Sequence, residues 1–271
     1  MHNTITVNLF RLLLAVIFFA MSAGAQADLQ DATEAYEKGN YPAALKEFRR
    51  LAVSGDATAQ YNLGMMYHKG QGVAQDFKEA AVWYRYAVKQ GDADALNSLG
   101  ILYQYGEGMS RDYDEAASLY HRAAGQGHAG AQFNLGQMYH NGKGVPQNYK
   151  EAAWWYRKAA AQGSAMAQYN LGVLYANGQG VPQDFKEAAS WYLKAAEQKN
   201  SKAQHSLGLM YESGQGVTQD WLQAHMWYNL AAGDGYETAE RSRRSIEYKL
   251  AAAQIEQAQA LARKWLAEHS N

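Results

Sequence analysis

Apolar residues in the middle of the chain recur at helical spacing, in short runs that glycine-rich turns separate. Ala59, Leu63 and Met66 lie three or four positions apart and therefore share one face of a predicted helix. After a short loop, Ala80 and Tyr84 begin a second apolar stripe with the same spacing. The pattern predicts two short amphipathic helices joined by a turn.

The turn carries residues that end one helix and begin the next. Gly70 follows the last apolar position of the first helix, and glycine takes the left-handed conformation there without a Cβ clash. Gly72 is expected to let the chain reverse. Asp76 precedes Glu79 by three positions, which predicts a capping box with reciprocal hydrogen bonds. The Gly-x-Gly sequence is therefore predicted to be a turn and not a phosphate-binding loop.

This helix–turn–helix unit occurs five times at an interval of 36 residues, without insertion or deletion. The predicted repeats are 56–91, 92–127, 128–163, 164–199 and 200–235. Each repeat has a glycine and a buried tyrosine that we predict to be structural: Gly64, Gly100, Gly136, Gly172, Gly208, Tyr84, Tyr120, Tyr156, Tyr192 and Tyr228. One unit cannot bury its apolar face alone, so neighbouring units must stack. The sequence thus predicts an all-α fold, a right-handed superhelical solenoid.

The end of the fourth repeat departs from this pattern. The other four repeats end in glycine, whereas Lys199 stands at this position and Asn200 follows it. Because asparagine tolerates the left-handed conformation, we expect Asn200 to provide the turn.

The segment AQYNLGMMYHKGQGVAQDFKEAAVWYRYAVKQG, which starts at Ala59, resembles the Sel1-like repeat family. The resemblance extends over five adjacent copies, from Asp56 to Gly235. The family is similar to tetratricopeptide repeats but has a longer loop between its two helices. The resemblance implies a solenoid that serves as an adaptor or scaffold.

Residues 28–55 and 236–271 are predicted to cap the two ends of the solenoid. The first segment reads as two helices joined at Gly39 and resembles an ordinary tetratricopeptide hairpin. The apolar face of the predicted final helix consists of Ile255, Ala258, Ala262, Trp265 and Leu266. An arginine cluster precedes this helix and is formed by Arg241, Arg243 and Arg244. It is either a solvated face of the cap or a basic patch for a partner.

The N-terminus has the layout of a secretory signal peptide. Arg11 precedes an apolar run from Leu12 to Met21, and small residues follow it up to Ala27. We predict a signal peptide at residues 1–27, cleaved after Ala27, and a mature protein that is periplasmic or secreted. The alternative is an uncleaved membrane anchor, although the run is shorter than the roughly 20 residues that a spanning helix needs.

Composition restricts the chemistry of the chain. The absence of cysteine excludes disulfides, thiol catalysis and a lipoprotein anchor. The net charge of −1 gives no electrostatic reason to expect nucleic acid as a partner. The eight histidines show no metal-ligand spacing, and neither G-x-S-x-G nor H-E-x-x-H occurs. We therefore predict no catalytic residue, no metal and no cofactor.

By its resemblance to tetratricopeptide solenoids, the chain is expected to line a concave groove with its first helices. The residue before each Leu-Gly pair is asparagine or serine, which are poor residues for a helix interior. This row either binds the backbone of an extended peptide or ties its helix to the previous repeat. The predicted partner-binding residues are Tyr61, Asn62, Met65, His68, Asn97, Ser98, Gln104, Phe133, Asn134, Gln137, His140, Tyr169, Asn170, His205 and Ser206.

The mixed character of this groove suits a protein or peptide segment. We predict a non-catalytic exported scaffold that binds such a segment, with no nucleic-acid partner and no stable membrane insertion after signal cleavage. One alternative is peptidoglycan binding through the aromatic residues of the groove. Another is a β-lactamase-like hydrolase, as suggested for cysteine-rich relatives, but this chain lacks their paired cysteines and any S-x-x-K sequence.

Overall fold

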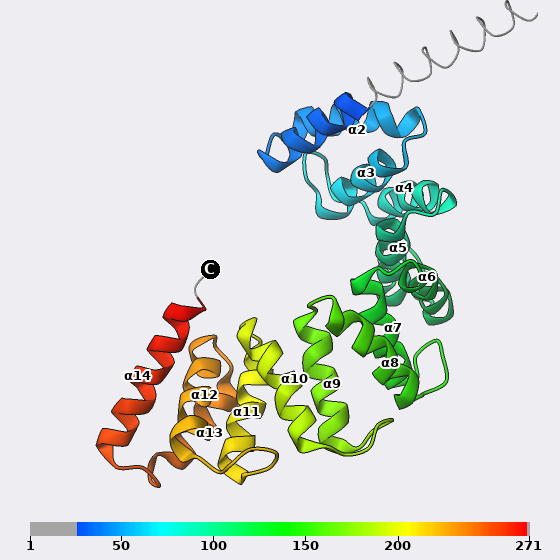
Figure 1. Cartoon of the computed structure of the whole chain (residues 1–271). Coiled ribbons are helices and arrows are strands. Elements are labelled where there is room, and N and C mark those ends of the chain that lie inside the picture. Colours follow the sequence, from blue (N-terminus) through cyan, green and yellow to red (C-terminus); the bar gives the residue numbers. More distant parts are fainter. Residues whose placement is uncertain (1–25, 270–271) are drawn as a thin grey trace, which may run out of the picture. The chain divides into compact units, whose positions relative to one another are not determined.

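The computed structural model describes residues 26–269, and every regular element in this range is an α-helix. Residues 26–37 form the first described helix, and α2 to α14 follow along the chain (Figure 1). The predicted all-α repeat class is therefore confirmed. The predicted signal peptide lies outside the described residues, apart from its last two positions.

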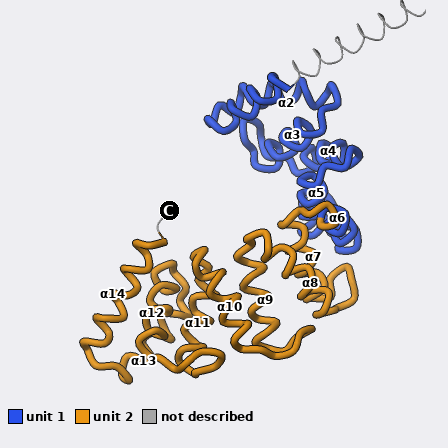
Figure 2. Tube along the Cα trace, in the orientation of Figure 1, with its two compact units in different colours: residues 1–123 blue, residues 124–271 orange. Residues whose placement is uncertain are grey.

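The chain divides into two compact units, residues 1–123 and 124–271, and the boundary falls inside α6 (Tyr113–Gly125) (Figure 2). The other named helices of unit 1 are α2 (Tyr41–Val53), α3 (Ala57–Lys69), α4 (Phe77–Lys89) and α5 (Ala93–Tyr105). The helices of unit 2 are α7 (Ala129–Asn141), α8 (Tyr149–Ala161), α9 (Ala165–Asn177), α10 (Phe185–Glu197), α11 (Ser201–Ser213), α12 (Trp221–Gly233), α13 (Glu237–Glu247) and α14 (Ala252–Glu268). Within each unit, the two helices of a repeat pack together, and the second packs on the first helix of the next repeat.

The N-terminal hairpin closes the first repeat of unit 1. Ala32 from the first described helix and Phe48 from α2 are buried in one cluster with Leu63 of α3. The guanidinium of Arg50 reaches back to the carboxylate of Asp28, with 2.7 Å between Nη2 and Oδ2. These contacts cover the apolar face that the first repeat presents at its open side.

Left-handed glycines end the first helices, as predicted. Gly70 has a φ of 69°, and its N–H donates a hydrogen bond to the carbonyl of Met66. The equivalent glycines in the other repeats, Gly106, Gly142, Gly178 and Gly214, have the same conformation. At the start of α4, the carboxylate of Asp76 accepts hydrogen bonds from the N–H groups of Lys78 and Glu79. The caps of both helices therefore satisfy backbone groups that the helices leave unpaired.

The predicted reciprocal capping box is wrong in its second half. Glu79 does not reach back to Asp76, because its Oε1 accepts a hydrogen bond from Nε1 of Trp83 at 2.9 Å. The N–H of Asp76 donates instead to the carbonyl of Tyr67 in the first helix, also at 2.9 Å. The equivalent backbone bond forms in all five repeats. It ties the start of each second helix to the first helix of its own repeat.

The turn after the fourth repeat also differs from the prediction. Lys199 has the left-handed backbone, with a φ of 61°, whereas Asn200 has a φ of −73°. Asn200 is the N-cap of α11, where its Oδ1 accepts a hydrogen bond from the N–H of Ala203 at 3.0 Å. Because this role requires an extended backbone, the left-handed position falls to the residue before it. Lys199 is the only non-glycine with a positive φ in the described part of the chain.

A glycine in each first helix accommodates the ring of the buried tyrosine. A Cβ atom at Gly136 would lie 2.6 Å from Cδ1 of Tyr156, and one at Gly208 would lie 2.4 Å from Cε1 of Tyr228. The five repeat tyrosines are at most 5% exposed, as the apolar stripe predicts. The ring therefore fills the space that the missing glycine side chain leaves between the two helices.

The second glycine of each turn contacts the preceding repeat. A Cβ atom at Gly180 would lie 2.2 Å from the backbone carbonyl carbon of Tyr149, and one at Gly216 would lie 2.2 Å from the backbone oxygen of Phe185. Tyr149 and Phe185 are the first residues of α8 and α10. The turn thus packs directly on the start of the previous second helix, where a side chain has no space.

The helices α13 and α14 cover the end of unit 2. Ile246 of α13 and Ala262 of α14 are at most 1% exposed and belong to apolar clusters that include α12. Trp265 packs its ring on Trp227, with 5.7 Å between the centroids. Leu266, which was predicted to share this face, is 42% exposed. Consecutive residues of an α-helix point about 100° apart, so Leu266 lies on a different face of α14 from Trp265.

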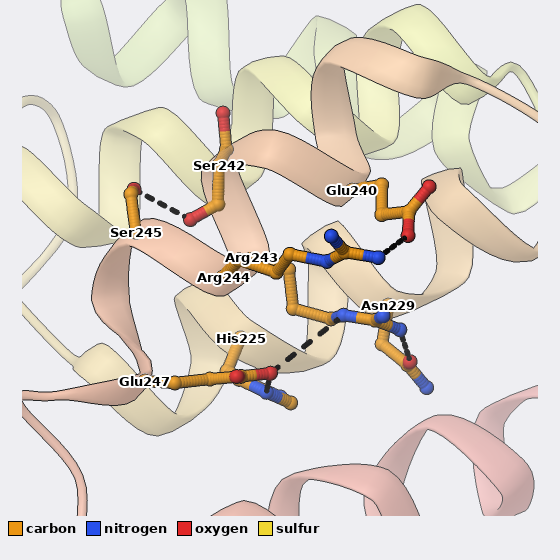
Figure 3. Close-up of polar contacts among 8 residues, drawn as sticks. All are labelled: His225, Asn229, Glu240, Ser242, Arg243, Arg244, Ser245 and Glu247. Atoms are coloured by element: carbon orange, nitrogen blue, oxygen red, sulfur yellow. Dashed lines mark hydrogen bonds and ion pairs between the residues drawn. The ribbon is translucent and has the colours of Figure 1, made fainter.

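Two arginines of the cluster, Arg243 and Arg244, form ion pairs within the C-terminal cap (Figure 3). Arg244 pairs with Glu240 on the same helix, and Nε of Arg243 lies 3.9 Å from Oε1 of Glu247. Glu247 also lies 3.4 Å from Nε2 of His225, whose side chain is fully buried. Burial lowers the pKa of His225, and Glu247 opposes this shift. These contacts favour the capping interpretation over a basic patch for Arg243 and Arg244.

Buried glutamines connect neighbouring repeats. Nε2 of Gln132 donates to the carbonyl of Ala124 at 3.3 Å, and its Oε1 accepts from Nε2 of Gln162 at 2.8 Å. Gln198 donates to Oε1 of Gln168 in the same way, at 2.8 Å. The bond to Ala124 reaches the second helix of the preceding repeat. The two glutamine–glutamine bonds join the start of a repeat's first helix to the turn that ends its second helix.

The last repeat lacks the glutamine–glutamine bond. Gln204 is 1% exposed, and its Oε1 has no hydrogen-bond partner among the described residues. Asp234 stands where the other repeats have glutamine, and a carboxylate cannot donate.

We expect Asp234→Gln to raise the free energy of unfolding by about 0.5–1.5 kcal/mol in urea denaturation, because the new amide can donate to Oε1 of Gln204. Asp234→Asn is the control, because it removes the same charge but has a side chain one methylene shorter than that of glutamine. Equal gains in the free energy of unfolding for both variants would indicate an effect of the helix dipole and not a new hydrogen bond.

Candidate functional site

Unit 2 contains a hollow of about 490 Å³. Its walls come from α7, α9 and the start of α11, and from the turns that precede α11 and α13. The lining residues are Phe133, Gln137, Met166, Tyr169, Asn170, Lys199, Asn200, Ser201, Lys202, Asp234, Gly235 and Tyr236. Aromatic, amide and charged groups therefore meet in a space large enough for ligand side chains.

The hollow brings together four of the predicted groove residues. They lie on α7 and α9, where Phe133 and Tyr169 occupy the same repeat position, and Gln137 and Asn170 lie beside them. The remaining predicted residues do not line it: Tyr61, Asn62, Met65, His68, Asn97, Ser98, Gln104, Asn134, His140, His205 and Ser206.

Some of these remaining residues contact the hydroxyls of buried tyrosines. The hydroxyl of Tyr120 donates to Oε1 of Gln104 at 2.8 Å, and the hydroxyl of Tyr84 lies 3.4 Å from Nδ1 of His68. Burial lowers the pKa of His68, with Glu107 opposing the shift, so the neutral imidazole is favoured. Gln104 and His68 therefore support the tyrosine of their own repeat.

The asparagine–serine row contacts the same tyrosines from the following repeat. Burial raises the pKa of Tyr84, and a hydrogen bond with Ser98 partly opposes this shift. Asn170 makes the equivalent bond with Tyr156, whose pKa burial also raises. These contacts support an inter-repeat role for Ser98 and Asn170, while Asn170 also borders the hollow.

Two predicted groove residues are more buried than expected. Phe133 is 7% exposed, and its ring centroid lies 5.9 Å from that of Tyr156. His205 is 9% exposed, with its Nε2 3.0 Å from Oγ of Ser242 and its ring 5.4 Å from that of Tyr236. Burial lowers the pKa of His205. The prediction of an accessible side chain is wrong for His205, because the C-terminal cap covers it.

Sequence reasoning missed the part of the hollow that lies outside the predicted groove. The missed residues are Met166, Lys199, Asn200, Ser201, Lys202, Asp234, Gly235 and Tyr236. Most of them belong to turns between repeats, whereas the prediction considered only the first helices. The lysine at a turn position that is otherwise glycine was the one sequence feature that pointed here.

The hollow carries unbalanced charge. Lys199 and Lys202 are exposed, and neither forms an ion pair with any residue between 26 and 269. Asp234 is the only carboxylate among the lining residues. The lining therefore has two positive charges and one negative charge, beside a largely apolar wall.

Within the described residues, no group of three or more histidine, cysteine, aspartate or glutamate side chains has the arrangement of a metal site. None of the described helices combines the length and apolar character needed to cross a bilayer.

Stacked helix–turn–helix units with a lined hollow define an α-helical repeat protein. The Sel1 repeat model matches residues 57–92, 93–128, 129–164, 165–200 and 201–236. The chain belongs to the Sel1 repeat family. Proteins of this family generally serve as protein-interaction scaffolds and are typically non-catalytic.

The solved structures that are similar to this chain include two Sel1-like proteins of at least 30% identity. A Sel1 repeat protein from Oxalobacter formigenes is 32% identical, covers 89% of this chain and 96% of its own, and has a TM-score of 0.78. A protective antigen of uropathogenic Escherichia coli strains, which displays an SLR fold, is 30% identical, with a TM-score of 0.61. That match covers 90% of this chain and 61% of the antigen. A comparison with curated proteins gave no match.

Proposed function

We propose that this protein is an exported, non-catalytic scaffold that binds a polypeptide segment in the hollow of unit 2. The observation that carries the proposal is the hollow itself, in which Met166 and Tyr169 stand beside the amides of Gln137 and Asn170. Met166 is 57% exposed, although it is a large apolar residue. Membership of a family of interaction scaffolds supports the same class of function.

The chemistry of these side chains suits a polypeptide. Tyrosine and methionine offer apolar surface to a ligand side chain, and the flexible thioether of Met166 adapts to different shapes. The amide of Gln137 both donates and accepts hydrogen bonds, so it can pair with the N–H and C=O groups of an extended backbone. An apolar anchor flanked by backbone contacts is a common arrangement in peptide recognition.

The proposal of export rests on the sequence of the first 27 residues. The contacts of the N-terminal cap are compatible with a mature chain that begins at Asp28. Arg50 pairs with Asp28, and Ala32 is buried in the cap cluster. Cleavage after Ala27 leaves both contacts intact.

The test compares two double-alanine variants of the chain from Asp28. Met166→Ala with Tyr169→Ala removes apolar surface from the hollow. Trp154→Ala with Leu193→Ala removes side chains that are 43% and 42% exposed but do not line it. An array of end-capped random peptides identifies ligands of the unmodified protein, and fluorescence anisotropy gives their Kd values for each variant.

We expect the hollow variant to weaken peptide binding by about tenfold or more, and the control to stay within about twofold. Circular dichroism establishes that both variants are folded. Equal Kd values for the two variants would show that the hollow is not the binding surface.

A further inference from the structure

We infer that the hollow selects a peptide in which an acidic residue stands next to a large apolar residue. This inference rests on the proposed function, because it specifies the segment that the scaffold binds. Its basis is the pair of lysines, Lys199 and Lys202, beside the apolar wall formed by Met166, Tyr169 and Tyr236.

The turn at Lys199 differs from the equivalent turns in a way that folding does not require. Gly91 and Gly163 occupy the same position with a positive φ and with nothing within 4 Å of a Cβ atom. Lys199 adopts this conformation as a non-glycine, at a φ of 61°. A left-handed residue with a side chain costs roughly 1–2 kcal/mol, and such strain gathers at functional sites. This backbone strain marks the side chain of Lys199 as a candidate ligand contact.

The charges of the hollow indicate which group of a ligand the two lysines contact. Neither Lys199 nor Lys202 has an ion-pair partner among residues 26–269, and Asp234 is the single carboxylate of the lining. A ligand carboxylate placed between the lysines meets an excess of positive charge, whereas a ligand cation meets repulsion. The hollow is thus complementary in charge to an acidic side chain.

The apolar wall sets the second half of the specificity. Met166, Tyr169 and Tyr236 line the same hollow as the lysines, and Phe133 contributes its small exposed edge. An aromatic or long aliphatic side chain of the ligand removes this surface from water, at about 25 cal/mol per Å² of apolar area. Because wall and lysines share one cavity, a single ligand segment reaches both when its acidic and apolar residues are adjacent.

The experiment uses three pools of end-capped peptides that differ at one position. All have randomised flanks and a central phenylalanine, which is followed by glutamate, glutamine or lysine. We expect the glutamate pool to bind the unmodified protein about threefold to tenfold more tightly than the glutamine pool, and the lysine pool to bind most weakly. The preference is expected to shrink between about 20 mM and about 500 mM salt, because exposed charges are screened.

Three variants locate the preference. Lys199→Gln with Lys202→Gln is expected to abolish the difference between glutamate and glutamine pools. Lys199→Gly is expected to weaken the preference while raising the melting temperature, since it relieves the left-handed strain. The control, Lys150→Gln with Lys186→Gln, removes two exposed lysines of α8 and α10 that do not line the hollow, and is expected to keep the preference.

The outcomes separate this inference from the proposed function. Equal binding of glutamate and glutamine pools, still weakened by Met166→Ala with Tyr169→Ala, would overturn the acidic preference and leave peptide binding intact. A preference that survives Lys199→Gln with Lys202→Gln would also overturn it. No binding of any pool would overturn both.

Discussion

Replacing Gly180 with alanine is expected to lower the free energy of unfolding by about 2–5 kcal/mol, which is a large part of the stability of a domain. Two effects add at this position. The φ of 70° is unfavourable for any residue with a Cβ atom, and that atom would lie 2.2 Å from the backbone carbonyl carbon of Tyr149. Because the obstacle is backbone and not a flexible side chain, the turn and α8 must move apart.

Gly163→Ala is the matched control for this prediction. Gly163 also has a positive φ, of 91°, but nothing lies within 4 Å of a Cβ atom there. Alanine at this position is therefore expected to cost only the left-handed penalty of about 1–2 kcal/mol. Urea denaturation followed by circular dichroism measures both variants. Equal losses at Gly180 and Gly163 would show that the contact with the preceding repeat does not constrain the turn.

The contrast between these glycines shows which part of the fold the sequence predicts. The positions of Gly70 and Gly72 after an apolar helical stripe are sufficient to predict a helix end and a reversal. The close approach of Gly180 to Tyr149 depends on the distance between stacked repeats. No local pattern encodes that distance, so the constraint becomes visible only when neighbouring repeats are in place.

Four of the predicted groove residues border the hollow where repeat symmetry holds, and another is covered where that symmetry ends. Tyr169 lines the hollow of unit 2, as its place in the first helix suggested. His205 occupies the same repeat position, yet Tyr236 and Ser242 of the C-terminal cap cover it. The cap does not follow the 36-residue period, so equivalence between repeats carried no information about it.

The charged part of the hollow was missed for a related reason. A repeat pattern directs attention to what the copies share, and Lys199 and Lys202 lie where one junction differs from the others. Asp234 is a second such departure, since it replaces the glutamine of the other repeats and also lines the hollow. In a solenoid, the shared positions build the stack, and departures from them are the better guide to a site.

The second large effect is expected inside a repeat, at Gly136. A Cβ atom there would lie 2.6 Å from Cδ1 and 2.7 Å from Cε1 of Tyr156, which is 1% exposed. We expect Gly136→Ala to lower the free energy of unfolding by about 2–3 kcal/mol, because a ring in a close-packed core moves only by displacing its neighbours. Gly233→Ala is the control, since Gly233 lies in a helix with nothing within 4 Å of a Cβ atom. There alanine is expected to be neutral or to stabilise α12 by up to about 1 kcal/mol.

A double-mutant cycle shows whether the loss at Gly136 comes from the ring of Tyr156. Tyr156→Ala alone is expected to cost about 3–5 kcal/mol, because it opens a cavity between the two helices of the repeat. Once the ring is absent, Gly136→Ala has nothing to displace and is expected to cost nothing further, or to recover about 1 kcal/mol through higher helix propensity. The two changes are therefore expected to be strongly non-additive. Additive losses in urea denaturation would mean that Gly136 is required for a reason other than the space that Tyr156 occupies.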